Sequence, residues 1–460
     1  MHICIIGTGT AGWMTANFLY RLGAEITIIG SPHIPPIGVG ESNTLALTDF
    51  HEDMGISIEE FIRESDATVK TGVYYKGWSK HDFIHSFKSG EYIEQFGITT
   101  SEYFQSFGNK PTDVPFSFYY GSDLLEAIDK NHFLPDSPQY HFSYHFDAGK
   151  YINYLSKLNP QINVIHDTVK DVVFKDDEEI DHLILSDRTF SADYYIFATG
   201  QSEFNERKLK VKYNDLSSVL LTNKAWVYPL EFTNKREQFT PYTCAKTMKY
   251  GWRWITPTYS RIGTGYVFSD SHVTAEKALQ EFLEDIGDYS IIPRLVDFHP
   301  KYSEKTFYNN YCLIGMANGF LEPLDAPGLS LTINVLNQLN NLLFSLQIDS
   351  YYQIERANDL MKYDYEFWTS FILLQYKTSI RNDTQFWIDH KKVKYDFYEN
   401  TISRLYTIPL DFLSGNCDMI FHTTTAKDVQ WDLPYKRQPI KIPSFESKSV
   451  HHLDYIEQFH

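Results

Sequence analysis

The stretch HICIIGTGTAGW, residues 2–13, decides the expected fold. Residues 2–6 are a short apolar run, which predicts a buried strand, and the glycine pattern GxGxxG follows at once. Residues 13–22 have the apolar spacing of a helix, and residues 24–29 are typical of a second strand. Strand, glycine turn, helix and strand together predict the opening of an α/β protein that binds a dinucleotide.

Glycines in such a turn let the backbone approach a pyrophosphate, and the N-terminus of the next helix offers N–H groups and the positive end of its dipole. The candidate contacts are Gly7, Gly9, Thr10, Ala11, Gly12 and Trp13. A purely structural turn is the alternative interpretation. Residues 28–31 read IIGS and lack the acidic residue that usually holds the ribose, so we expect the adenosine to be bound differently or more weakly.

The composition excludes several classes of protein. The net charge of −18 disfavours nucleic acid and anionic membrane surfaces as partners, and the apolar content of 43% disfavours disorder. The four cysteines form no CxxC pair and the histidines show no metal-ligand spacing, so we predict neither a disulfide framework nor a metal site. The sequence shows no membrane-spanning apolar run and no signal peptide, which predicts a cytoplasmic protein.

Further elements are expected along the chain. We predict strands at 162–174, 182–185, 194–198 and 313–315, sheet at 242–256 and 263–268, and helices at 151–158, 275–286, 329–346 and over most of 351–400. The aromatic and proline-rich residues 101–140 are typical of a loop-rich insertion. No linker separates domains, so we predict a single compact chain over residues 1–460.

Residues 249–257, KYGWRWITP, place two tryptophans two positions apart. Side chains alternate between the faces of a strand, so Trp252 and Trp254 are expected on the same face. Core packing is the ordinary explanation, and a rigid aromatic wall beside a ligand is the functional one.

Three more stretches are candidates for chemistry. Residues 37–42, IGVGES, would either press against a flat ligand or form an ordinary turn. Residues 315–328, GMANGFLEPLDAPG, precede an expected helix, so their N–H groups would bind an anion or only cap that helix. Lys70 has no local feature that separates it from Lys76 or Lys80, and single lysines are usually exposed.

Taken in order, these stretches resemble the flavin-dependent halogenases of the tryptophan-halogenase type from residue 1 to about residue 390. The matching motifs are GxGxAGW at 7–13, IGVGE at 37–41, a lysine at 70 with a tryptophan at 78, YHFDA at 144–148, PYT at 241–243, GWRWITP at 251–257, GYV at 265–267, GFLEPLDAP at 319–327 and RNDTQFW at 381–387. Several separated motifs in the same order are far more specific than one glycine turn. We expect a divergent, virus-encoded member of the family.

The resemblance implies an α/β fold, with an FAD-binding, Rossmann-like module that has a mixed β-sheet and an interleaved, mainly helical module that covers the substrate. We expect residues 1–100 with 141–330 in the flavin-binding module and residues 101–140 with 331–460 in the substrate-covering module. It implies further FAD contacts at Gly38, Val39, Gly40, Glu41, Thr199, Gly200 and Gly315.

The resemblance also implies a mechanism. A separate flavin reductase supplies FADH2, which reacts with O2 to give a flavin C4a-hydroperoxide, and a halide held near Pro327, Gly328 and Leu329 is oxidised to hypohalous acid. Lys70 then presents electrophilic halogen to an electron-rich aromatic ring. The carboxylate of Asp325 polarises the oxidant or takes the ring proton.

The family places its two tryptophans beside the flavin, and both are kept here as Trp252 and Trp254. They would form a wall that keeps an organic substrate from the flavin while a small anion passes.

Other positions depart from the family pattern. Its Glu-Ser-Thr is Asp325, Ala326 and Pro327 here, which removes a hydroxyl and a backbone N–H, and its WxWxIP carries Thr256. We therefore expect a roomier, less polar halide site that favours bromide or iodide over chloride. Gln375 stands where a histidine is expected, and the sequence gives no reason for that change.

The expected substrate is a free phenol, indole or aniline rather than tryptophan, because the C-terminal region that covers it departs most from the family. Six rings of the insertion would line its pocket or belong to the core: Tyr103, Phe104, Phe116, Phe118, Tyr119 and Tyr120. A flavin-dependent aromatic monooxygenase and a non-catalytic flavoprotein are the alternative functions. A homo-oligomer is compatible with the sequence, and a viral member would work in the host cytoplasm.

Overall fold

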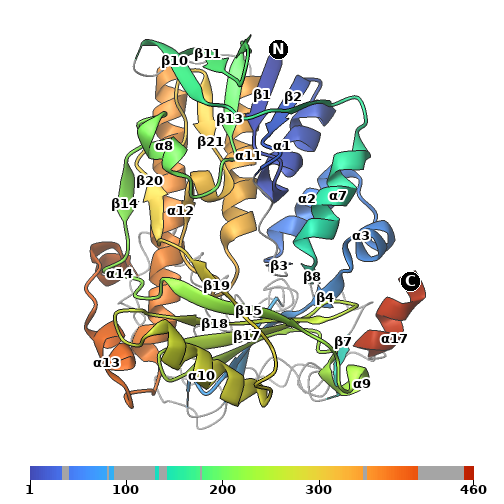
Figure 1. Cartoon of the computed structure of the whole chain (residues 1–460), viewed down its shortest axis with the longest axis vertical. Coiled ribbons are helices and arrows are strands. Elements are labelled where there is room, and N and C mark those ends of the chain that lie inside the picture. Colours follow the sequence, from blue (N-terminus) through green and yellow to red (C-terminus); the bar gives the residue numbers. More distant parts are fainter. Residues whose placement is uncertain are drawn as a thin grey trace, which may run out of the picture. The chain divides into compact units, whose positions relative to one another are not determined.

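The structure is a computed structural model that describes residues 1–33, 41–79, 82–87, 130–133, 142–176, 179–344, 350–401 and 450–460 (Figure 1). The chain forms two compact units. The first contains Met1–Ala67, Phe146–Lys224 and Val296–Thr369, and the second contains Thr68–His145, Ala225–Leu295 and Ser370–His460.

The first unit is built on a five-stranded parallel sheet. Its order is β21 (Tyr311–Leu313), β13 (Tyr194–Phe197), β1 (His2–Ile6), β2 (Glu25–Gly30) and β9 (Asn163–His166). Strand β1 is central and almost wholly apolar, as expected for a parallel strand with both faces covered. Helix α1 (Thr10–Arg21) crosses from β1 to β2, so the glycine turn lies at the carboxyl edge of the sheet, where ligands of such folds bind.

Helices and two small sheets surround this sheet (Figure 1). The helices are α2 (Ala46–Met54), α3 (Ile58–Ser65), α7 (Ala148–Leu158), α8 (Glu203–Arg207) and α11 (Gly328–Phe344), and α12 (Ser350–Thr378) runs from this unit into the second. The small sheets are β10 (Asp171–Asp176) with β11 (Glu179–Ile184) and β12 (Thr189–Phe190), and β14 (Tyr213–Asp215) with β20 (Lys301–Ser303) and β22 (Gly319–Phe320). A single apolar cluster joins the first of them to the parallel sheet through Leu183, Tyr195 and Leu313.

Asp364 on α12 gives a testable pH dependence of stability. Burial raises the pKa of its carboxyl from 3.8 to about 6, although Asn334 Nδ2 donates to it at 2.8 Å. The folded chain thus holds this proton more tightly than the unfolded chain, so stability falls as pH rises through about 6. We expect Asp364→Asn to raise the free energy of unfolding at pH 7 by about 2 kcal/mol in urea titrations.

The gain should disappear near pH 4, where the carboxyl is protonated in the folded chain. Asp359 is exposed on the same helix, and Asp359→Asn is the matched control, with no expected gain. Equal stability of wild type and Asp364→Asn at pH 7 would contradict the assignment.

The second unit is built on a seven-stranded mixed sheet. Its order is β19 (Arg294–Asp297), β15 (Lys224–Leu230), β18 (Ile262–Phe268), β17 (Gly251–Pro257), β16 (Thr243–Met248), β5 (Gly72–Lys76) and β6 (Phe83–Ser86). Strand β17 lies in the middle and is antiparallel to both neighbours, whereas β16 and β5 are parallel. Beside this sheet, β4 (Thr68–Lys70) pairs antiparallel with β8 (Ser143–Phe146).

Helix α10 (Ala275–Ile286) covers one face of this sheet. Arg253 of β17 points to that helix, where its Nη1 lies 2.7 Å from Asp285 Oδ2 and its Nε donates to Thr264 Oγ1. Burial alone would raise the pKa of Asp285, but hydrogen bonds from Lys246 and Arg253 outweigh it and lower that pKa. Neighbouring residues on a strand point to opposite faces, so the residues on either side of Arg253, which are Trp252 and Trp254, face away from α10.

The remaining elements of the second unit are short. They are β7 (His132–Phe133), α9 (Lys235–Gln238), α13 (Gln385–Lys392), α14 (Asp396–Thr401), β23 (Val450–His451) and α17 (His452–Ile456). Strand β3 (Glu41–Ser42) belongs to the first unit. Within the described ranges, no helix combines the length and the apolar character needed to cross a bilayer.

Most expected elements are confirmed, including the opening strand, turn, helix and strand. The prediction of a strand at 313–315 is wrong, because β21 ends at Leu313 and Gly315–Ala317 form a 3₁₀ turn. Gly315 has φ +62°, a left-handed conformation that no strand contains. Of residues 101–140, only 130–133 are described, so the predicted pocket rings lie outside the described residues.

The two units follow other boundaries than the predicted modules. The second unit contains the seven-stranded sheet, and the predicted modules with their boundaries stay a prediction. Strands from residues 72–86 and 243–268 pair directly, and backbone pairing of this kind unites segments that the sequence separates. The single compact chain stays a prediction.

Candidate active site

The glycines of the turn have two different roles: some are required by close backbone packing, and one leaves space for a ligand. A Cβ on Gly7, which has φ +122°, would lie 2.3 Å from the carbonyl oxygen of Ala198, and a Cβ on Gly12 would lie 1.9 Å from that of Gly7. The fold itself therefore requires both. Gly9, the N-cap of α1, has φ −78°, and no atom of the described residues lies within 4 Å of the place of its Cβ, so this part of the protein leaves the surface open.

Two further segments meet this turn at the same edge of the sheet. Gly200, three residues after the last paired residue of β13, has φ +67° and no atom of the described residues within 4 Å of the place of a Cβ, and Thr199 donates to the side chain of Asn205. Gly315 follows β21 and brings its Cα so close to α1 that a Cβ would lie 2.7 Å from that of Ala11. These backbone edges form the open surface that a dinucleotide needs.

The missing ribose acid has a structural explanation. A Cβ on Gly30, the last residue of β2, would lie 2.4 Å from the methyl group of Thr8. An acidic side chain therefore has no room at this position. Ser31 Oγ lies 2.9 Å from Thr168 Oγ1, so the next position serves to hold the loop.

The segment before α11 has an unusual backbone. Asp325 has φ +59° and Ala326 has φ +54°, both in the left-handed region that costs a residue with a Cβ about 1–2 kcal/mol. Strain of this kind often marks a functional loop. Asp325 is buried, and α11 begins directly after Pro327, whose carbonyl accepts from Leu331 N–H at 2.9 Å.

The predicted halide contacts lie at this helix start. Pro327 has no N–H, so the backbone donors available there belong to Gly328 and Leu329. A Cβ on Gly328 would meet no atom within 4 Å, which leaves room for an anion. Glu322, which the sequence interpretation left out, is buried three residues before Asp325 and accepts from Thr222 Oγ1.

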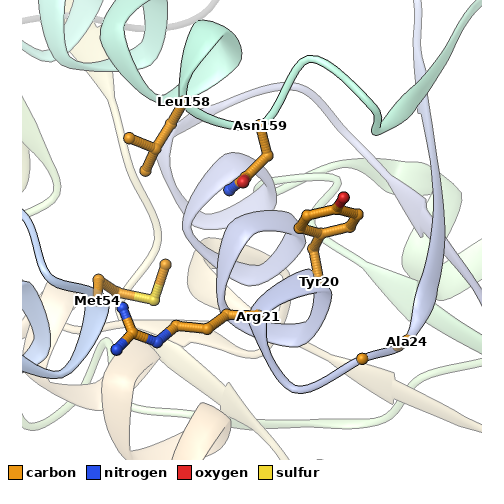
Figure 2. Close-up of a pocket in the computed structure, with 7 residues that line it drawn as sticks. Tyr20, Arg21, Ala24, Met54, Leu158 and Asn159 are labelled. Carbon is orange, nitrogen blue, oxygen red and sulfur yellow. The ribbon is translucent and has the colours of Figure 1, made fainter.

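The first unit also has a cavity of about 540 Å³, which is not the nucleotide site (Figure 2). Its lining comes from the C-terminal end of α1 and from the ends of α2 and α7, through Tyr20, Arg21, Met54 and Leu158. The glycine turn lies at the opposite end of α1, a distance of roughly 18 Å for a helix of this length. The cavity is therefore separate from the residues that carry the motifs.

Lys70, the last residue of β4, is fully buried in the second unit. Its Nζ lies 5.0 Å from the centre of the Phe87 ring, and its backbone pairs with Ser143. Lys76 on β5 is exposed, as single lysines usually are. The structure thus separates the predicted catalytic lysine from an ordinary one, which the sequence alone did not.

A buried hydrogen-bond network holds the strand of Lys70. Thr68 Oγ1 donates to the carbonyl of Pro257, the last residue of β17, at 2.7 Å. Its oxygen therefore accepts from His145 Nδ1–H at 3.2 Å, and His145 Nε2 accepts from Thr243 Oγ1 at 2.9 Å. Burial, and then the charge of Lys70, hold the pKa of His145 well below its ordinary value, so this ring stays neutral. The network ties the lysine strand to the end of the tryptophan strand.

The two tryptophans form a packed pair on the face of β17 away from α10. The ring centres of Trp252 and Trp254 lie 6.2 Å apart with planes inclined at 56°, and both side chains are buried. A Cβ on Gly265, opposite Trp254 on β18, would lie 2.1 Å from its indole. The absence of a side chain at Gly265 thus leaves room for the indole of Trp254.

Not all predicted residues can be placed. Gly38, Val39 and Gly40 lie outside the described residues, and Glu41 is described only as the first residue of β3. In the first unit, the glycine turn, Thr199, Gly200 and Gly315 gather at one edge of the sheet, with Trp13 buried in α1. In the second unit, Lys70 and the tryptophan strand are joined through Thr68 and Pro257.

Sequence interpretation missed several site residues. His145 and Glu322 lie inside the matched stretches YHFDA and GFLEPLDAP, which could have singled them out. Phe87 gave no signal of its own. Gln375, unexplained in the sequence, is fully buried, and neither atom of its amide has a hydrogen-bond partner among the described residues.

The family model described as tryptophan halogenase matches residues 2–408 of this chain. The chain therefore belongs to the tryptophan halogenase family.

Curated relatives agree with this family. The tryptophan 6-halogenase SttH of Streptomyces toxytricini is 27% identical over 434 residues, which cover 85% of this chain and 80% of that protein. The tryptophan 7-halogenase RebH of Lentzea aerocolonigenes is 26% identical over 420 residues, which cover 85% and 79%.

Solved structures share the fold. The tryptophan halogenase of Shewanella frigidimarina NCIMB 400 has a TM-score of 0.81 at 23% identity, over 100% of this chain and 92% of that chain. The SttH crystal structure has a TM-score of 0.80 at 23% identity, over 90% and 89%. The predicted fold class is confirmed.

Proposed function

We propose that this protein halogenates an electron-rich aromatic small molecule, with FADH2, O2 and a halide ion as the other reactants. The observation that carries the proposal is Lys70, which is wholly buried, lies over an aromatic ring and belongs to a strand that a hydrogen bond from Thr68 ties to the tryptophan strand. A buried lysine needs a reason, because removing a charged group from water is costly. Presentation of an electrophilic halogen is such a reason.

The residues of the first unit fit a flavin dinucleotide. The open surface over Gly9 and Gly200 admits a pyrophosphate, and the N-terminus of α1 offers N–H groups. Reduced FAD, when bound, supplies with O2 the oxidising power that converts a halide ion to hypohalous acid. Without the usual ribose acid at Gly30, the adenosine would be held by other groups.

The chain's own residues would then act on the hypohalous acid. The Nζ–H of Lys70 donates to its oxygen, which makes the halogen more electrophilic. The aromatic ring attacks the halogen, the halogen–oxygen bond breaks, and the hydroxide that leaves takes the Lys70 proton to become water. A carboxylate takes the proton that leaves the ring. We assign this last role to Asp325. In this proposal the packed tryptophan pair would keep organic substrates and water away from the flavin, as the resemblance implies.

We expect the halide site to favour bromide or iodide over chloride. Among the predicted halide contacts, Gly328 and Leu329 keep an N–H, Pro327 has none, and the neighbouring Ala326 offers no hydroxyl, so a strongly hydrated ion would lose more on entry. Turnover with equal concentrations of the three halides checks this. At least a severalfold preference for bromide or iodide is expected, and a strong preference for chloride would refute it.

The remaining proposals concern substrate and partners. A free phenol, indole or aniline is the proposed substrate, and a separate flavin reductase is the proposed source of FADH2. Cytoplasmic location, a homo-oligomer and a viral source of the gene stay predictions.

The test of the proposed function is product identity. Reduced FAD, O2, bromide or iodide and a panel of phenols, indoles and anilines are combined with the protein, with catalase present and a no-enzyme control beside it. Mass spectrometry then identifies the products. Halogenated product that forms in the complete mixture and not in the no-enzyme control supports the proposal. Hydroxylated product would indicate a monooxygenase, and no product would indicate a non-catalytic flavoprotein.

A further inference from the structure

The C-terminal segment, residues 450–460, docks inside the second unit. Val450 and His451 pair antiparallel with Phe133 and His132 of β7, and His452 N–H donates to the carbonyl of Asn131 at 2.8 Å. The family model ends at residue 408, so this segment lies beyond the part of the chain that defines the family. We refer to residues 450–460 as the clasp.

The clasp is fastened by charge and by stacking. Arg236 of α9 forms two parallel contacts with the carboxylate of Asp454, Nη1 to Oδ1 at 2.6 Å and Nη2 to Oδ2 at 2.9 Å. His460 stacks on Tyr259 with ring centres 3.7 Å apart. A two-point Arg–carboxylate contact fixes orientation as well as distance, so the position of the clasp is well defined.

One side chain of the clasp contacts the strand of Lys70. His452 is fully buried, and its Nε2 accepts from the backbone N–H of Val69, the residue before Lys70, at 3.0 Å. Because an N–H must donate, Nε2 carries no proton, and the proton lies on Nδ1, which faces the carbonyl of Phe239 at 3.4 Å. Burial lowers the pKa of His452 to about 3, so the ring can accept at any ordinary pH.

This contact completes the support of a short strand. Strand β4 has three residues and pairs with β8 along one edge only. The N–H of Val69 is satisfied by an imidazole rather than by a second strand. Beyond Lys70, both the N–H and the hydroxyl of Thr71 donate to the carbonyl of Pro241, at 2.7 and 2.8 Å. The backbone on both sides of Lys70 is thus anchored, and His452 supplies the anchor that precedes it.

We propose that His452 is a positioning residue for Lys70, delivered by the clasp, and that its bond to Val69 holds the lysine in the geometry of halogen transfer. The inference rests on the proposed function. A lysine displaced by a fraction of an ångström would still be buried but would intercept hypohalous acid poorly. Loss of the bond should therefore uncouple flavin oxidation from product formation and should leave flavin oxidation itself unchanged.

The experiment compares wild type with His452→Leu, which removes the acceptor, and with His452→Gln, which returns one at similar reach. His390→Leu is the matched control, because His390 is an equally buried imidazole of the same unit that stacks on Tyr376. In single turnovers with reduced FAD, O2, bromide and a phenol, we measure product formed and free hypohalous acid trapped by a soluble scavenger. Hydrogen–deuterium exchange of the peptide that contains residues 68–71 is measured in parallel, without flavin.

His452→Leu is expected to lower the ratio of product to flavin oxidised by roughly tenfold or more, to raise trapped hypohalous acid, and to speed exchange at Val69. His452→Gln should recover most of both signals, and His390→Leu should change neither. The proposal would be overturned if His452→Leu kept the wild-type ratio of product to flavin oxidised and the wild-type exchange at Val69. It would also be overturned if His452→Gln or His390→Leu lost as much product as His452→Leu. If the wild type halogenates nothing, the proposed function fails, while unchanged exchange in His452→Leu overturns the positioning role separately.

Discussion

Lys70→Met is expected to lower the yield of halogenated product by roughly a hundredfold or more, while the protein stays folded and oxidises bound FADH2 at the wild-type rate. The loss is expected because methionine keeps the length of the side chain but has no donor for hypohalous acid. Folding should not suffer, since replacing a buried charged group by an apolar one of similar volume is often neutral or stabilising. Product is measured by mass spectrometry, and stability by urea unfolding.

The control is Lys76→Met, which removes the exposed lysine of β5 and should leave product formation within twofold of wild type. Hypohalous acid should accumulate in solution with Lys70→Met and not with the control. Equal halogenation by wild type and Lys70→Met would mean that free hypohalous acid reacts in solution and that Lys70 is not the carrier.

Gly9→Ala and Gly12→Ala are expected to have different effects, the first on FAD affinity and the second on stability, so the pair separates ligand binding from folding. A Cβ on Gly12 would lie 1.9 Å from a backbone oxygen, so Gly12→Ala should lose several kcal/mol of stability or fail to fold. A Cβ on Gly9 meets no protein atom within 4 Å, so Gly9→Ala should keep stability within about 1 kcal/mol of wild type. It should nevertheless bind FAD at least tenfold more weakly, because the methyl group occupies the approach of the pyrophosphate.

Thermal unfolding of the flavin-free proteins and FAD titration by fluorescence check both halves. Gly23→Ala is a useful reference, since Gly23 is exposed at the other end of α1, also meets no atom within 4 Å and has φ +88°. It should cost some stability through backbone strain and leave FAD affinity unchanged. Wild-type FAD affinity in Gly9→Ala would show that the dinucleotide does not lie over this glycine.

The opening stretch predicted its own structure well. Residues 2–6, the glycine turn, the helix and the next strand appear where the sequence placed them, because buried parallel strands and glycine turns have strong local signatures. The order of motifs also predicted the family. The absence of the ribose acid was read from the sequence, whereas its cause, the methyl group of Thr8 against Gly30, is visible only in the fold.

The sequence could not separate Lys70 from other lysines by local pattern. Its burial comes from Phe87, from β8 and from a network in which the nearby Thr68 bonds to His145 and Pro257, which are distant in sequence. His452 shows this most clearly, because 383 residues separate it from Val69, the partner whose N–H it accepts. No pattern of neighbours along a chain encodes such a contact.

Local chemistry thus determined the glycine turn and the two same-face tryptophans, since each depends on residues a few positions apart, and the order of motifs along the chain determined membership of the family. Tertiary structure decided which lysine is buried, which glycines serve the fold and which leave room for a ligand, and where the chain's end lies. The physical reason is that burial and close approach are properties of packed segments. The same lysine or glycine has a different environment, and so a different role, according to which distant strand or ring lies against it.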